Sequence, residues 1–143
     1  MSKELNVLID TSGSMGEDCK NAVVKYLLGT ITSCAGTGYL NCYLAGNQCT
    51  KVENLSGVKI TYGGQMTPNA INSYFNEALG DDKTLLISDG CFDVDVEKAI
   101  SKFRDKVICV AVGEDAMISN LQRCSRNKKV YLAEDVNAAI AVC

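Results

Sequence analysis

Short apolar runs alternate with longer amphipathic segments along this chain, which is the pattern of an α/β protein. The run from Leu5 to Ile9 is almost continuously apolar, and similar runs occupy residues 83–88 and 106–113. Such runs predict central parallel strands that are buried on both faces of a sheet. Further, shorter strands are predicted at 39–45, 50–55, 58–62 and 128–133.

Between these strands, the spacing of apolar residues predicts helices. The segment from Glu17 to Thr32 has apolar residues every three or four positions, and its predicted buried face contains Cys19, Val23, Tyr26, Leu27, Thr30 and Ile31. A second helix is predicted between Pro68, which suits a first helical turn, and Gly80, which suits a helix end. Three more helices are predicted at 94–105, 115–125 and 134–143.

The resulting order is roughly β-α-β-β-α-β-α-β-α-β-α, in which the short segments at 50–55 and 58–62 count once. Crossovers of this length favour a doubly wound, mostly parallel sheet of Rossmann-like type, with helices on both faces. The segment at 58–62 is the candidate for one antiparallel edge strand. No linker or repeat divides the chain, so residues 1–143 are predicted to form a single domain.

Composition limits the classes of partner. The apolar fraction is 47%, the net charge is −3, and basic residues are scattered apart from a short group between Arg123 and Lys129. This distribution gives no electrostatic footprint for nucleic acid. No apolar run approaches the length of a membrane span, and the N-terminus does not resemble a signal peptide, so a cytoplasmic protein without membrane contact is expected.

The cysteine and histidine content restricts the chemistry. Eight cysteines are present, but no C-x-x-C pair and no histidine, which argues against a structural zinc site. A Ser-His-Asp or Cys-His enzyme cannot be assembled without histidine. Reduced thiols are expected in a cytoplasmic setting, although Cys42 and Cys49 flank a predicted strand connection and are the candidates for a pair.

Polar side chains collect where predicted strands end. Asp10, Ser12 and Ser14 follow the first strand, Thr67 precedes the second helix, and Asp89 follows the strand at 83–88. If the chain stays extended after Ile9, the first three side chains point the same way. Ligands of open parallel sheets bind at the carboxyl ends of strands, so all five side chains are predicted to meet there. Hydroxyl and carboxylate oxygens suit a hard cation such as Mg²⁺.

These residues carry a family resemblance. The segment "IDTSGSM" resembles the D-x-S-x-S signature of von Willebrand factor A (VWA) domains, which opens their metal-ion-dependent adhesion site, or MIDAS. "GGQMTPN" matches the family's threonine loop and "ISDG" its later aspartate, in the same order along the whole chain. One departure is that Gln65 and Met66 separate the glycines from Thr67, which leaves Thr61, inside a predicted strand, as a weaker substitute.

The resemblance implies a VWA-like domain with a metal site. Ser12, Ser14 and Thr67 would be hydroxyl ligands, and Asp10 and Asp89 would hold the ion directly or through water. The ion would be Mg²⁺, or else Mn²⁺ or Ca²⁺. Its open position would accept an Asp or Glu carboxylate from a partner protein.

Simpler interpretations exist for each motif. Ser12 or Ser14 suits the N-cap of a helix, with Asp10 near the positive end of its dipole. The residues before Pro68 suit a loop and helix cap, and "SDG" suits a turn.

Three functions follow as hypotheses. The first is a non-enzymatic, metal-dependent protein-interaction module, for example an adaptor or assembly factor beside a MoxR-type AAA+ ATPase, as the resemblance suggests. The second is a Mg²⁺-dependent phosphatase or phosphotransferase with Asp10 as nucleophile, although position 12 carries serine where a second acid is usual. The third is a structural protein whose metal site is vestigial.

Overall fold

A computed structural model describes residues 4–17, 19–35, 40–53, 59–80 and 82–143. Six strands form one sheet in the order β3-β2-β1-β4-β5-β6. The strands are β1 (Leu5–Asp10), β2 (Leu40–Ala45), β3 (Cys49–Lys51), β4 (Thr84–Ser88), β5 (Val107–Ala111) and β6 (Val130–Leu132). All neighbouring strands are parallel except β2 and β3, so the predicted doubly wound sheet with one antiparallel edge strand is confirmed.

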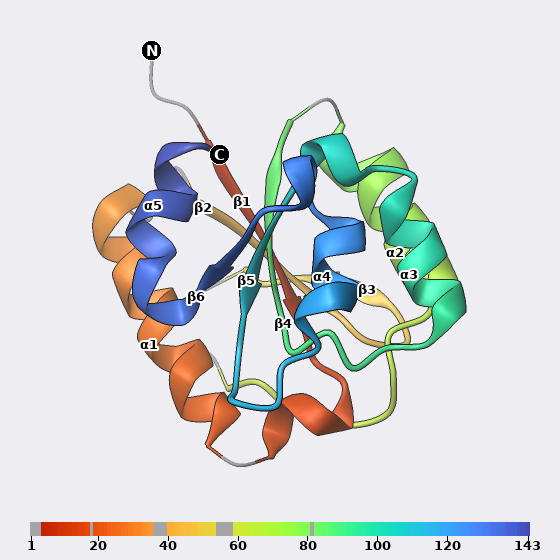
Figure 1. Cartoon of the computed structure of the whole chain (residues 1–143), viewed down its shortest axis with the longest axis horizontal. Coiled ribbons are helices and arrows are strands. Elements are labelled where there is room, and N and C mark those ends of the chain that lie inside the picture. Colours follow the sequence, from red (N-terminus) through yellow and green to blue (C-terminus); the bar gives the residue numbers. More distant parts are fainter. Residues whose placement is uncertain (1–3, 18, 36–39, 54–58, 81) are drawn as a thin grey trace.

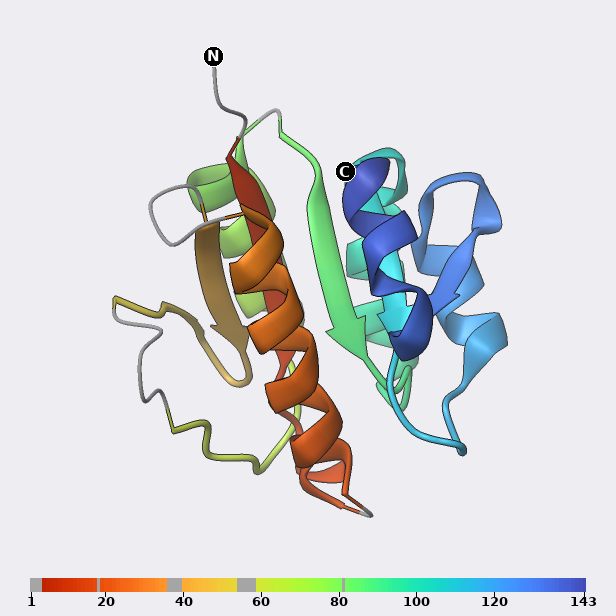
Figure 2. The same cartoon turned by 90° about the vertical axis from the view of Figure 1, so that its left-hand side faces the viewer.

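Helices cover both faces of this sheet, as predicted. They are α1 (Lys20–Ala35), α2 (Pro68–Ser73), α3 (Val94–Ser101), α4 (Ile118–Cys124) and α5 (Val136–Ala141), and a π-helical segment, Tyr74–Leu79, continues α2. Helices α1 and α5 lie on one face, and α2, α3 and α4 lie on the other (Figures 1 and 2). The core consequently has two layers, one on each side of the apolar central strands.

The edge of the sheet differs from the sequence-based expectation. The antiparallel edge strand is β3, which overlaps only the first two residues of the strand predicted at 50–55. The strand predicted at 58–62 is wrong for residues 59–62, which have no strand pairing, and residue 58 lies outside the described residues. Thr61 is therefore an exposed loop residue and not a strand residue.

The first helix has the predicted period but a different buried face. Val24, Leu27 and Ile31 are fully buried, whereas Tyr26 is 56% exposed and Cys19 is exposed. The buried stripe begins at Lys20, one turn before Val24, and its side chain is 1% exposed. The predicted face contained Cys19 and Val23 in place of Lys20 and Val24, so it was displaced by one residue at this end of the helix.

The cysteines are free thiols. Cys49 lies opposite Ala45 in the sheet, and not opposite Cys42. Burial raises the pKa of Cys42 to about 12 and that of Cys49 to about 11, so both thiols stay protonated at neutral pH. Among the described residues, no helix combines the length and apolar character that a membrane crossing requires.

Candidate metal centre

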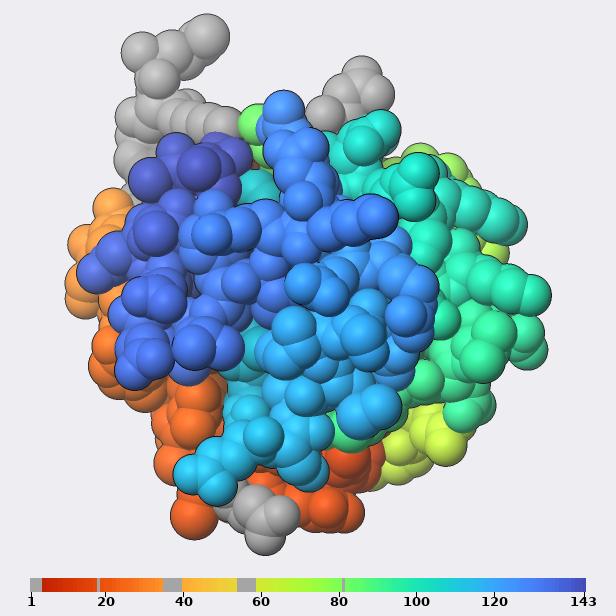
Figure 3. Space-filling model, in the orientation of Figure 1, coloured from red at the N-terminus to blue at the C-terminus, as the bar shows by residue number. Residues whose placement is uncertain are grey.

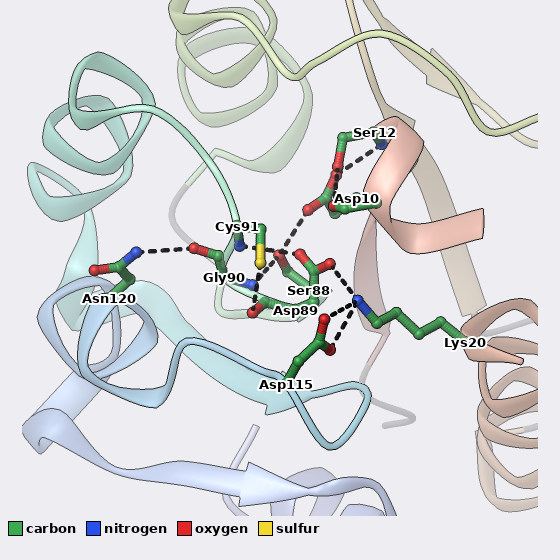
Figure 4. Close-up of polar contacts among 10 residues, drawn as sticks. Asp10, Ser12, Lys20, Ser88, Asp89, Gly90, Cys91, Asp115 and Asn120 are labelled. Atoms are coloured by element: carbon green, nitrogen blue, oxygen red, sulfur yellow. Dashed lines mark hydrogen bonds and ion pairs between the residues drawn. The ribbon is translucent and has the colours of Figure 1, made fainter. Parts of the chain in front are cut away.

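Asp10 ends β1 and organises the loop that follows it. Its side chain is fully buried; Oδ1 accepts a hydrogen bond from the Ser12 backbone N–H at 2.9 Å, and Oδ2 accepts one from the Ser88 hydroxyl at 2.7 Å (Figure 4). Burial raises the pKa of Asp10 because the charged form loses water, and the hydrogen bonds from Ser88 and Ser12 offset this only in part. Asp10 thus joins the carboxyl ends of the neighbouring strands β1 and β4.

Ser12 and Ser14 are brought together by a turn. Ser12 is extended, but a 3₁₀ helix begins at Gly13 and ends at Gly16, so the chain does not stay extended after Ile9. The hydroxyl oxygens of Ser12 and Ser14 are nevertheless 3.3 Å apart. Ser12 is the N-cap of this turn, and its side chain makes no capping hydrogen bond there. Its hydroxyl is therefore not used as a cap.

Asp89 directly follows β4 and completes the cluster. Its side chain is fully buried; Oδ1 accepts from the Cys91 backbone N–H at 3.0 Å, and Oδ2 accepts from the Lys20 ammonium at 3.0 Å (Figure 4). Burial alone would raise the pKa of Asp89, but hydrogen bonds from Cys91, Lys20 and Ser14 together lower it. Ser14 is thus close enough to Asp89 to stabilise its charged form.

Thr67 is held on the adjoining loop. Its hydroxyl donates to the Asn47 carbonyl at 2.9 Å and accepts from the Ala70 backbone N–H at 3.2 Å, so it caps α2 ahead of Pro68. The glycine loop itself contacts the first loop, since Gly13 N–H donates to the Gly64 carbonyl at 3.0 Å. Among the described residues, no hydrogen bond joins Thr67 to the cluster. The structure thus joins four of the five predicted residues, and the role of Thr67 as a ligand stays a prediction.

Three further residues belong to the site and were missed from the sequence. Lys20 lies between Asp89 and Asp115, and its ammonium is 2.9 Å from Asp115 Oδ1. Burial lowers the pKa of Lys20, but the hydrogen bonds to Asp115 and Asp89 outweigh this and raise it. The sequence could have indicated two of them, because Ser88 is adjacent to Asp89 and Lys20 lies one helical turn before the buried Val24. It gave no such indication for Asp115, on the loop after β5.

The oxygen atoms of this cluster suit a hard cation. Asp10, Ser12, Ser14 and Asp89 offer two carboxylates and two hydroxyls at the ends of adjacent strands, all oxygen and without sulfur or imidazole. Mg²⁺ accepts such a set and completes its shell with water. Within the described residues no group of three or more acidic, histidine or cysteine side chains is placed to hold a metal, so the serine hydroxyls are necessary members of this one. The four residues fit Mg²⁺, with the Lys20 ammonium as a competitor for Asp89.

Gly113 leaves the space that the Lys20 side chain occupies. The loop after β5, in light blue, lies against the orange beginning of α1 (Figure 3). Gly113 has a φ of +92°, and a Cβ atom there would lie 2.6 Å from Lys20 Cε and 3.0 Å from Asp115 Oδ1. Glycine at 113 is therefore required both by its backbone conformation and by the packing of Lys20.

We expect Gly113→Ala to lower the free energy of unfolding by about 2–4 kcal/mol, because it adds backbone strain and displaces a buried ammonium. Urea denaturation followed by circular dichroism measures the change. Gly29→Ala is the control, because Gly29 is exposed within α1 and has nothing within 4 Å of the added Cβ. A Gly113→Ala variant as stable as Gly29→Ala would contradict this prediction and show that the Lys20 side chain can adopt another conformation without loss of stability.

Comparisons with known proteins identify the fold. No protein-family model and no curated protein sequence matches the chain. Solved structures do match: a von Willebrand factor type A protein from Catenulispora acidiphila superposes with a TM-score of 0.67 at 14% identity over 99% of this chain. BatB from Bacteroides thetaiotaomicron gives 0.68 at 12% identity, and an aerotolerance-related membrane protein from Bacteroides fragilis gives 0.66 at 14% identity, each over 99% of this chain.

These matches differ in how much of the other protein they cover. The chain spans 42% of the Catenulispora protein, but 98% of each of the two Bacteroides proteins. The similarity thus extends over the whole domain, while the sequence identity is too low to carry a function with it. The strand order, the antiparallel edge strand and these superpositions together show that the chain has the VWA-like α/β fold.

Proposed function

We propose that the chain is a protein-interaction module of the VWA type, and that the carboxyl-end cluster holds Mg²⁺ when it binds its partner. The observation that carries this proposal is the grouping of Asp10, Ser12, Ser14 and Asp89 at the ends of two adjacent central strands. The VWA-like fold supports a role in protein interaction. The proposal that metal takes part rests on the oxygen atoms of this cluster.

In this proposal, the hydroxyls of Ser12 and Ser14 and the carboxylates of Asp10 and Asp89 hold the ion. Thr67 can join them only if its hydroxyl gives up the hydrogen bond to the Asn47 carbonyl and turns toward the ion. When bound, the ion supplies an open coordination position that a carboxylate of the partner can occupy. The partner is therefore a protein that presents an exposed Asp or Glu side chain.

A binding role suits Asp10 better than a catalytic one. The Asp10 side chain has no exposure, and both of its oxygens accept hydrogen bonds inside the protein. A nucleophile for phosphoryl transfer has to reach the phosphorus atom of its substrate. We therefore favour a non-enzymatic module; an adaptor role beside a MoxR-type AAA+ ATPase, in the cytoplasm, stays an expectation from the resemblance alone.

One observation favours a second candidate, a structural site that functions without metal. The Lys20 ammonium already places a positive charge against Asp89, 3.0 Å from Oδ2. In that case the cluster is a permanent internal ion pair, and divalent cations have no effect on partner binding.

Replacing both serines tests the proposal. We expect the double variant Ser12→Ala/Ser14→Ala to bind Mg²⁺ at least about tenfold more weakly than the wild type, because both hydroxyl ligands are lost. The fold is retained, since Ser12 holds Asp10 through its backbone N–H. Titration calorimetry with MgCl₂ measures affinity, and affinity purification in Mg²⁺ or in EDTA then measures partner capture.

Ser33→Ala is the matched control, because Ser33 is exposed on α1 and its hydroxyl, among the described residues, donates only to the helix carbonyl of Gly29. We expect this variant to behave as the wild type. Partner capture that survives EDTA and the double substitution would contradict the metal-dependent proposal and favour the structural site.

A further inference from the structure

Lys20 is built into the site by the fold. It is the first residue of α1 and begins the buried stripe that continues through Val24 and Leu27. Its aliphatic stem lies against the space left by Gly113, and its ammonium reaches the carboxyl ends of the strands (Figure 4). A lysine that is 1% exposed is uncommon unless its charge is paired. The side chain is therefore fixed in place and not a solvated surface group.

The two carboxylates that hold this ammonium differ in their surroundings. Asp89 is fully buried and belongs to the proposed metal ligands, whereas the Asp115 side chain is 59% exposed on the loop after β5. The Lys20 ammonium lies 3.0 Å from Asp89 Oδ2, 2.9 Å from Asp115 Oδ1 and 3.2 Å from Asp115 Oδ2. Asp115 is thus able to hold the ammonium with both oxygens when Asp89 turns to another cation.

Both carboxylate oxygens of Asp89 are occupied by hydrogen-bond donors while Lys20 is in place. One carboxylate oxygen accepts the Cys91 N–H and the other accepts the ammonium. A divalent cation that approaches Asp89 meets a positive charge within a few ångströms, in a region with little water to screen the repulsion. Lys20 and the metal therefore compete for the same carboxylate.

Resting on the proposed metal site, we infer that Lys20 is an internal cation that sets the affinity of this site for divalent metal. Lys20 holds Asp89 when no metal is bound, and Asp115 keeps the ammonium when metal takes Asp89. The site is thereby kept ordered without metal, and metal binding is coupled to the loop that carries Asp115. Changes at Lys20 and at Asp115 should consequently alter metal affinity in opposite directions.

The test measures MgCl₂ and MnCl₂ affinity by titration calorimetry in Lys20→Met and Asp115→Asn. We expect Lys20→Met to bind about tenfold more tightly than the wild type, because the competing charge is gone. We expect Asp115→Asn to bind about threefold more weakly, because the ammonium then depends more on Asp89. Lys25→Met, exposed on the same helix, and Glu114→Gln, exposed on the same loop, carry the same charge changes and serve as controls.

Each outcome decides between the two proposals. Equal metal affinity in the wild type and Lys20→Met, or weaker affinity in Lys20→Met, overturns the inference and leaves the metal site standing. No metal binding in any variant overturns the metal site together with the inference. Should Lys20→Met fail to fold, Asp115→Asn decides alone: affinity equal to that of Glu114→Gln overturns the exchange of the ammonium, and weaker affinity supports it.

Discussion

Lys20→Met is expected to lower the free energy of unfolding by about 3–5 kcal/mol in metal-free buffer, because it removes one partner of a buried ion pair. Methionine replaces the aliphatic stem of lysine, so the packing of this stem against the loop at Gly113 is largely kept. The loss is electrostatic: Asp89 is fully buried and has no other cation within the described residues to hold its Oδ2. Urea denaturation in the presence of EDTA measures it.

Two companion variants separate the ion pair from the helix. Lys25→Met removes an exposed charge from the same helix and is expected to change stability by no more than about 0.5 kcal/mol. The double variant Lys20→Met/Asp89→Asn removes both charges and is expected to recover a large part of the loss. A double variant that is less stable than Lys20→Met alone would mean that packing, and not charge, is what Lys20 contributes.

The pH dependence gives an independent check of the same pair. The pKa of Asp89 is lowered from 3.8, so its contribution to stability is present above that value and is lost as the pH falls through the lower pKa of the folded state. The pKa of Lys20 is raised from 10.5, so its contribution is complete below that value and is lost as the pH rises through the folded-state pKa. The stability gap between wild type and Lys20→Met should therefore be constant near neutral pH and narrow below about pH 4.

The central part of the fold could be predicted because each strand has its own signal. The apolar runs that became β1, β4 and β5 are buried on both faces, so no alternation is needed to recognise them. A doubly wound topology makes β1 and β4 neighbours near the centre of the sheet, which is why Asp10 and Asp89 could be expected together. The edge was not predictable in this way, because β3 has three residues and its pairing depends on the turn after β2.

The residues with oxygen side chains that directly follow strands could be predicted from the sequence. The buried Lys20 ammonium could not. The juxtaposition of Ser12 and Ser14 arises from a 3₁₀ turn, although an extended chain was the reason for expecting it. Lys20 was missing from the predicted site because lysine is rarely buried without a partner, and its partners are 69 and 95 residues away. Such long-range pairing leaves no local pattern in the sequence.

Asp10→Asn is expected to weaken Mg²⁺ binding by about a hundredfold or more, because it removes one of the two carboxylate charges in the proposed ligand set. Asparagine is the informative substitution. Its side-chain oxygen can still accept the Ser12 N–H, whereas alanine would leave that N–H and the Ser88 hydroxyl without their acceptor. Burial raises the pKa of Asp10 because it disfavours the charged form. A neutral amide at this position is therefore compatible with the folded chain.

The fold of Asp10→Asn should consequently stay intact, with a change in unfolding free energy within about 2 kcal/mol of the wild type. Titration calorimetry with MgCl₂ measures the affinity, and the rise in melting temperature on adding Mg²⁺ gives a second readout, which should disappear in the variant. Asp105→Asn is the matched control, because Asp105 is exposed just before β5. It lies at the amino end of that strand, whereas the proposed metal site lies at the carboxyl ends of β1 and β4. Asp10→Asn with wild-type affinity would remove Asp10 from the ligands and leave it as the buried acceptor that joins β1 to β4.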